Sequence, residues 1–425
     1  MTVRRVRLLA GLGVALAAAG CHQDELFTPL PPQYAAGAMF ARYVSFGNSI
    51  TAGFQSFGLS DSLQVLAYPV LLARAMGTRF YYPKLNNPGC PNPIDSIFVV
   101  DQNSASPTFG KPHRLGNTFR DDLCALRSVP PPPYLNNVAF PGADVLELLN
   151  TNYGQPQPPA AATDAYKLFL LGGRTEIQRA REVRPTFVTV WVGNNDVLGA
   201  ILDQADAGSA ADITPPATFA TRYNALMDSI DSFGSVQGGV LLGVAQAAGA
   251  PYVSQGRYYK QASASIPTLT VLDNCLDSLV VGPGDTVRVL VPFHYGAPII
   301  GAAAAGSNQT LDCSVPQVIS VNEALGMIAT VIAYNATIKA AADARKWLYL
   351  DPNTLLQTLA QDPAQIRPFP AFPTSPPDPN SVIAPFGTAI SRDGIHPSTS
   401  TQKLIAQSLQ QAINAFYGSA IPAIP

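Results

Sequence analysis

A serine and an aspartate–histidine pair occur in this sequence where they could form a hydrolytic site. Ser49 lies in the sequence GNS directly after the short apolar run 42–46, and His396 follows Asp393 by three residues in the sequence DGIH. A serine hydroxyl is a weak nucleophile until an imidazole takes its proton, and that imidazole needs a partner that fixes its tautomer. We therefore predict Ser49 as nucleophile, His396 as its base and Asp393 as the group that orients His396.

Two further sites could bind a developing negative charge together with the backbone N–H of Ser49. Gly142 lies in the sequence NVAFPGA, before a helix expected from about Asp144, and a glycine at a helix start offers a free N–H. Asn195 follows a predicted strand in the sequence GNND, and its carboxamide donates hydrogen bonds without adding charge. The alternatives are an ordinary Pro-Gly turn and an Asp196 that caps the next turn.

The other histidines and the cysteines give no sign of a metal centre. His22 lies near the N-terminus, His113 has no nearby acid at the spacing of the pair above, and His294 either lines the pocket or belongs to a plain loop. The sequence contains no CxxC motif and no Cys/His cluster, so we predict neither a metal nor a cofactor.

Predicted strands alternate with predicted helices along most of the chain. The apolar or β-branched runs 42–46, 186–192, 240–244 and 347–350 indicate strands. Helical periodicity or capping residues indicate helices over 61–77, 219–230 and 322–346 and through Ile405 to Phe416. Such alternation predicts an α/β fold with a mainly parallel sheet covered on both faces, and active sites in such folds lie beyond the carboxyl ends of the strands.

The four motifs, in this order, resemble those of the GDSL esterase/lipase family, also called SGNH hydrolases. The resemblance assigns Ser49 as nucleophile, Gly142 and Asn195 to the oxyanion hole with the Ser49 N–H, and Asp393 and His396 to the final motif. It implies a three-layer, flavodoxin-like α/β/α sandwich with about five parallel strands. Asn48 stands where the family has Asp, but that Asp is outside the catalytic set, so activity is expected to survive.

We expect one hydrolase domain over residues 40–418, with a short tail over 419–425. Two stretches do not fit the alternation and are predicted as loop insertions at the rim, a first insertion at about 86–134 and a second at about 245–318. Four cysteines fall inside them and allow three pairings, of which we predict Cys90–Cys124 and Cys275–Cys313. Buried free thiols are the alternative.

The N-terminus reads as an export signal. Three arginines precede a short apolar run, and the sequence AAGC ending at Cys21 resembles the lipobox of bacterial lipoproteins. We predict a signal peptide over 1–20, a lipidated Cys21 and a tether over 21–39. The protein would then be an exported bacterial lipoprotein, anchored in the membrane through its lipid on the outer membrane, periplasmic or surface face. An ordinary signal with an incidental cysteine is the alternative.

Composition excludes two broad classes of protein. Of 425 residues, 47% are hydrophobic and 13% charged, which argues against disorder, and a net charge of −2 gives no footprint for nucleic acid. The motifs and their resemblance to the GDSL family imply a serine hydrolase that cleaves carboxylic esters, its substrate a small ester, a lipid or an acetylated glycan. The alternative is a catalytically silent surface lipoprotein that binds glycan or lipid in the same cleft.

Overall fold

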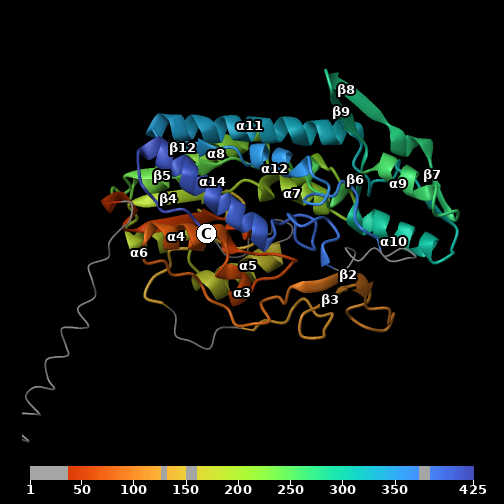
Figure 1. The fold of residues 1–425 in the computed structure, drawn as a ribbon, viewed down its shortest axis with the longest axis horizontal. Helices are drawn as coiled ribbons and strands as arrows, with labels where there is room; N and C mark the ends of the chain where they lie inside the picture. Colours follow the sequence, from red (N-terminus) through yellow and green to blue (C-terminus); the bar gives the residue numbers. More distant parts are fainter. Residues whose placement is uncertain (1–36, 126–131, 150–159, 373–382) are drawn as a thin grey trace, which may run out of the picture.

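The computed structural model describes residues 37–125, 132–149, 160–372 and 383–425 (Figure 1). The predicted signal peptide, Cys21 and most of the predicted tether lie outside these ranges. The structure therefore does not bear on the predictions of export and lipidation.

A parallel sheet forms the centre of the fold. Its hydrogen-bonded order is β1-β4-β5-β12, and all three pairings are parallel. The strands are β1 (Tyr43–Gly47), β4 (Phe187–Trp191), β5 (Gly238–Leu242) and β12 (Leu348–Leu350). Every residue of the first three is buried, as expected for apolar strands covered on both faces. The four predicted strands are thus confirmed, with β5 beginning two residues earlier than expected.

The resemblance implied about five strands, and the fifth is present only as a single parallel bridge beside β1. Ser45 pairs with Asn137, with the Ser45 N–H bonded to the Asn136 carbonyl at 2.9 Å and the Val138 N–H bonded to the Ser45 carbonyl at 3.1 Å. With this segment counted second along the chain, the spatial order becomes 2-1-3-4-5. That order places the topological switch point between β1 and β4.

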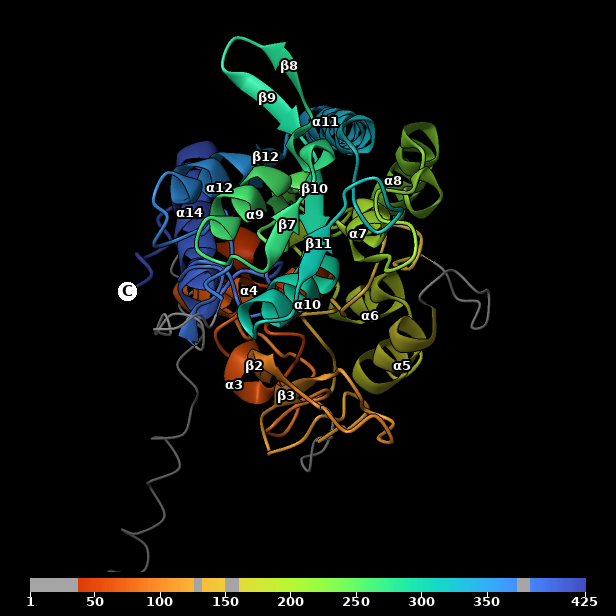
Figure 2. The same ribbon diagram turned by 90° about the vertical axis from the view of Figure 1, so that its right-hand side faces the viewer.

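Helices cover both faces of the sheet because successive strand residues point to opposite sides. Tyr43 and Phe187 pack with helices α4 (Tyr68–Met76) and α14 (Thr399–Tyr417) on one face. Val44 and Val188 pack with α6 (Glu176–Val183), α8 (Pro216–Asp231) and α11 (Val321–Arg345) on the other. Figure 2 shows the layers from the side, with α4 and α14 opposite α7 (Asn195–Leu202) and α8. The predicted three-layer α/β architecture is confirmed.

Helix α11 is also long and apolar enough to cross a membrane when judged by length and composition. Its contacts with β5, β12 and α8 are those of a core helix, so we assign it to the folded body. Outside the second insertion, the remaining described helices are η2 (Ala38–Phe40), α2 (Ser49–Ala52), α3 (Asp61–Gln64), α5 (Ala160–Leu171), η3 (Ala210–Asp212) and α12 (Pro352–Ala360).

Two helix predictions are wrong. The single helix expected over 61–77 is divided into α3 and α4, because Pro69 has no N–H to continue a preceding helix and instead occupies the first turn of α4. No helix begins near Asp144 in the part of the chain that the structure describes, and residues 141–149 form turns joined by irregular backbone. There the Val145 and Glu147 N–H groups bond to carboxylates of Asp196 and Asp144.

The second insertion holds more regular structure than the polar loops expected. It contains η4 (Ala247–Gly249), β6 (Val253–Gln255), α9 (Gly256–Ser263), β7 (Leu269–Val271), η5 (Asp273–Leu276), β8 (Ser278–Gly282), β9 (Asp285–Arg288), β10 (Leu290–Pro292), α10 (Phe293–Ala304) and β11 (Gln309–Leu311). A separate apolar cluster that includes Tyr259, Val291 and Ile300 supports it. The first insertion contains only the pair β2 (Ile94–Val100) and β3 (Pro112–Arg114) among its described residues.

Both predicted disulfides are present in the structure. Cys90 is bonded to Cys124 in the first insertion, and Cys275 is bonded to Cys313 in the second. Each bridge therefore closes a loop within one insertion rather than joining the two.

Candidate active site

Ser49 lies in a sharp turn at the carboxyl end of β1. The strand ends at Gly47, the Asn48 side chain accepts a hydrogen bond from the Ile50 N–H at 3.1 Å, and Ser49 is the first residue of α2. A Cβ atom at Gly47 would lie 2.5 Å from the Trp191 carbonyl oxygen, so the close approach of this turn to β4 requires glycine. The Asn48 side chain thus caps the first turn of α2.

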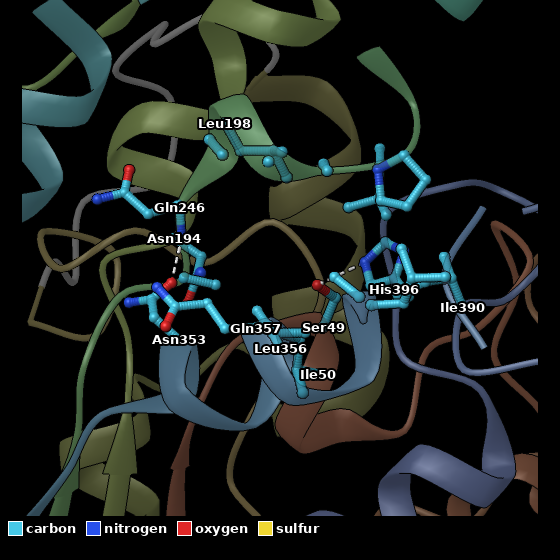
Figure 3. Close-up of a pocket in the computed structure, with 18 of the residues that line it drawn as sticks. Ser49, Ile50, Asn194, Leu198, Gln246, Asn353, Leu356, Gln357, Ile390 and His396 are labelled. Atoms are coloured by element: carbon cyan, nitrogen blue, oxygen red, sulfur yellow. Dashed lines mark hydrogen bonds between the residues drawn. The ribbon is translucent and has the colours of Figure 1, made fainter. Parts of the chain in front are cut away.

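The structure brings the three predicted triad residues together across 347 positions of sequence. His396 Nε2 lies 2.8 Å from Ser49 Oγ, and His396 Nδ1 lies 2.8 Å from Asp393 Oδ2 (Figure 3). Both distances are within hydrogen-bonding range. One ring nitrogen of His396 thus faces the hydroxyl while the other is held by the carboxylate.

Asp393 is buried and held by several hydrogen-bond donors. Its Oδ1 accepts from the Ile395 and His396 N–H groups, both at 2.9 Å, and its Oδ2 accepts from the Phe57 N–H at 3.0 Å. Burial alone would raise the pKa of Asp393, but the charge of His396 and the hydrogen bonds from His396 and Ile395 lower the pKa to about 2. The carboxylate therefore stays ionised at neutral pH.

Two aromatic rings flank the imidazole. The Phe54 ring centroid lies 5.1 Å from that of His396 and the Phe57 centroid lies 6.4 Å from it, both in edge-on orientations. These ring contacts contribute to the burial of His396, whose residue is 5% exposed.

Asn195 lies at the carboxyl end of β4, beside Ser49. It is the first residue of α7, it lines the same cavity as Ser49, and its Nδ2 donates to the Ala143 carbonyl at 2.8 Å. The carboxamide has a second N–H, so one donor stays free for a substrate oxygen. Gly142 is exposed with φ at +84° and is not among the residues that line this cavity.

Asp196 does not cap the following turn, which was the alternative for this motif. It is buried, and its Oδ2 accepts a hydrogen bond from the Val145 N–H at 3.0 Å, which ties α7 to the segment after Gly142. Burial, followed by the negative charge of Asp144, raises the pKa of Asp196 to about 7.

Two buried polar residues that sequence reasoning missed hold the nucleophile turn. Glu176 Oε2 accepts the Gly47 N–H at 3.0 Å, and burial raises the pKa of Glu176 well above its usual value. Gln402 Nε2 donates to the Ile50 carbonyl at 3.0 Å. Glu176 follows Thr175 in a helix capping box, so in sequence it looks like an ordinary first-turn acid.

A cavity of about 240 Å³ opens beside Ser49 and His396. Most of the side chains that line this cavity are apolar, and His396 is the one ionisable side chain among them. Figure 3 shows carboxamides gathered on the side of Ser49 away from His396, with Leu198 and Leu356 between the two ends. The larger apolar residues are Ile50, Leu198, Leu356, Ile366, Ile390 and Ile395, and the carboxamides are Asn194, Asn195, Gln246, Asn353 and Gln357.

The other histidines in the described ranges lie apart from this cavity. His294 Nδ1 is 3.1 Å from the Tyr252 hydroxyl and does not line the cavity, so the structure gives no support to a pocket role for it. His113 Nδ1 pairs with Asp95 at 2.6 Å. Within the described ranges, no group of three or more His, Cys, Asp or Glu side chains is arranged to hold a metal ion.

No family model matches the sequence, and no curated protein sequence matches it. Among solved structures, the chain is similar to a mutant of Axe2, an acetyl-xylooligosaccharide esterase from Geobacillus stearothermophilus, with 12% identity, a TM-score of 0.33 and coverage of 87% of this chain and 93% of that one. It is also similar to an extracellular lipase from Streptomyces rimosus, with 14% identity, a TM-score of 0.36 and coverage of 87% and 98%.

Proposed function

We propose that the protein is a carboxylic ester hydrolase of the GDSL esterase/lipase type, with Ser49, His396 and Asp393 as its catalytic triad. The observation that carries this proposal is the continuous hydrogen-bonded chain from Ser49 Oγ through both nitrogens of His396 to a buried carboxylate. Such a chain is what a serine needs in order to act as a nucleophile.

In the proposed reaction, Ser49 Oγ attacks the acyl carbon while His396 Nε2 takes its proton. The tetrahedral oxyanion would be bound by the free N–H of the Asn195 carboxamide and by the backbone N–H of Ser49. The Gly142 N–H is proposed as a third donor on the family resemblance alone, since Gly142 does not line the cavity. His396 then gives its proton to the leaving alcohol, and a water activated by His396 releases the acid. Asp393 stays ionised throughout and stabilises the imidazolium.

The cavity favours an uncharged ester with an apolar acyl group. Because His396 must protonate the leaving alcohol, that alcohol belongs on the His396 side of Ser49 and the acyl group on the opposite side, toward Leu198 and Leu356. An apolar cavity of about 150 Å³ holds a benzene ring. The 240 Å³ here therefore suits an acyl chain of moderate length.

We also propose that the enzyme is exported and anchored through a lipid on Cys21, because the sequence that ends at this cysteine resembles a lipobox. An ester hydrolase held at a membrane or cell surface would meet lipid esters and acetylated glycans there. Lipid esters and acetylated glycans therefore both belong to the proposed substrate class.

Turnover of p-nitrophenyl esters from acetate to palmitate, alongside acetylated sugars, tests the function. Purified protein should hydrolyse at least one series, and a fluorophosphonate should add to Ser49, as located by peptide mass spectrometry. Ser49→Ala should lose both reactions. If the wild-type protein neither hydrolyses any ester nor reacts with the fluorophosphonate, it is a binding protein rather than an esterase.

A further inference from the structure

Ser56 and Phe57 form a tight turn beside Asp393. Gln55 and Gly58 exchange two backbone hydrogen bonds of 3.0 Å, so Ser56 and Phe57 are the central residues of a two-residue turn. Both have positive φ, 53° and 47°, where Asn and Gly are the usual residues. A bulky side chain in this conformation is strained and persists only where surrounding contacts hold it.

On one side the turn is bonded to the loop that carries the proposed catalytic acid. The Phe57 N–H donates to Asp393 Oδ2 at 3.0 Å, and the Ser56 N–H donates to the Ser391 hydroxyl at 2.9 Å. The same Asp393 oxygen is bonded to His396 Nδ1. The orientation of the Phe57 peptide therefore bears directly on the position of the oxygen that holds the imidazole.

On the other side the turn is bonded to the first insertion. The Ile94 N–H donates to the Ser56 carbonyl at 2.8 Å. Nη1 of Arg114 donates to the Phe57 carbonyl at 2.9 Å and to the Asn92 carbonyl at 2.6 Å. One guanidinium nitrogen of Arg114 thus joins the first insertion to Phe57, the residue whose N–H is bonded to Asp393.

Arg114 is buried, which is unusual for a charged residue in an insertion at the rim. Its side chain is largely buried, with the residue 6% exposed, and within the described ranges its guanidinium bonds to backbone carbonyls and forms no ion pair. Burial of a cation is costly unless hydrogen bonds compensate it. A buried cation that binds two carbonyls beside a strained turn is placed to fix the position of the backbone there.

We propose that Arg114 is a positioning residue for the proposed ester hydrolysis: it fixes the Phe57 carbonyl and thereby the Phe57 N–H that holds Asp393 in line with His396. The inference rests on the proposed function. It makes the first insertion part of the catalytic framework, in addition to any part it has in shaping the rim.

Arg114→Met tests this role, with Arg120→Met as the matched control. Arg120 lies in the same insertion but is exposed and pairs with Asp122. The measurements are kcat and KM for a p-nitrophenyl ester, the rate of Ser49 phosphonylation by a fluorophosphonate, and Tm. Arg114→Met should lower kcat and the phosphonylation rate by about 10- to 10²-fold, the scale of a small misplacement of reacting groups, with KM within about twofold. Arg120→Met should match the wild type.

If Arg114→Met does not fold, Arg114→Lys tests the proposed positioning role instead. Lysine keeps the charge but lacks the planar fork of donors, so the Arg114→Lys rates should fall below those of the wild type, by less than the loss expected of Arg114→Met. A folded Arg114→Met, or failing that a folded Arg114→Lys, that reacts at the wild-type rate overturns the inference alone. If the wild-type protein does not react at Ser49 at all, the proposed function fails, and the role of Arg114 fails with it.

Discussion

Ser49 and Asn195 should contribute to turnover by very different amounts. Ser49 and His396 act as one unit, so Ser49→Ala should reduce kcat by about 10⁴-fold or more. Asn195 supplies one of three proposed donors to the oxyanion, and Asn195→Ala should cost about 10²- to 10³-fold in kcat. Steady-state kinetics of both folded variants would check the ordering. A Ser49→Ala variant with more than about a tenth of wild-type activity would show that another group is the nucleophile.

Ionisation of Asp196 should make the free energy of unfolding depend on pH above the range in which an aspartate usually titrates. Its pKa is raised from 3.8 to about 7 in the folded protein by burial and by Asp144, so the folded state holds a proton that the unfolded chain has lost. The resulting stabilisation is complete below pH 3.8 and is lost as the pH rises through 7. The loss should amount to about 4 kcal/mol at most.

Asp196→Asn, which cannot ionise, tests this dependence. Urea unfolding at pH 4, 5.5 and 8 should show the variant close to the wild type at pH 4 and increasingly more stable than it toward pH 8. A difference between the two proteins that is the same at all three values would contradict the shift.

Proximity of the triad was predictable from residue types, whereas the contacts that hold it were not. A serine after a strand and an Asp three residues before a His are local patterns with a chemical meaning. Glu176, Gln402 and Arg114 act on the site through backbone atoms of segments far away in sequence. Because almost every residue has a backbone N–H and a carbonyl, the sequence does not indicate which of these groups a distant side chain will bond to.

Among elements, the buried strands were the most predictable. Apolar runs such as Phe187–Trp191 have one stable place, inside a sheet covered on both faces. The second insertion was less predictable because short strands such as Val253–Gln255 and Leu269–Val271 depend on partners far along the chain. Its apolar residues form a cluster only after these strands have paired.

Helix α12 should set the length of acyl chain that the enzyme accepts. Leu356 projects from it into the cavity near Ser49 (Figure 3). Leu356→Trp would fill part of the space proposed for the acyl chain. It should lower kcat/KM for an octanoate ester by about tenfold, while the acetate ester changes little.

Thr354→Trp is the control for that substitution, because Thr354 is exposed on the same helix and does not line the cavity. Its chain-length profile should match the wild type. Equal losses on acetate and octanoate in Leu356→Trp would show that the acyl group lies elsewhere.

At the scale of the molecule, the sheet gathers the site from three distant parts of the chain. Ser49 follows β1, Asn195 follows β4, and these neighbouring strands flank the switch point of the sheet order. His396 precedes α14, whose Gln402 is bonded to the turn after Ser49. Because these anchors belong to the sheet and its covering helices, the site is held by the core, and most of the rim is free to vary around it.

The anchor at Cys21 is the prediction that concerns the whole molecule. Residues 22–36 are 15 in number, so even fully extended they would keep the folded body within about 50 Å of a lipid on Cys21. The enzyme would thus work close to its membrane. Cys21→Ser should abolish lipidation and move the protein from the membrane fraction to the soluble fraction, without changing kcat on a soluble ester. Membrane association that survives the substitution would show that the chain is held there by something other than this cysteine.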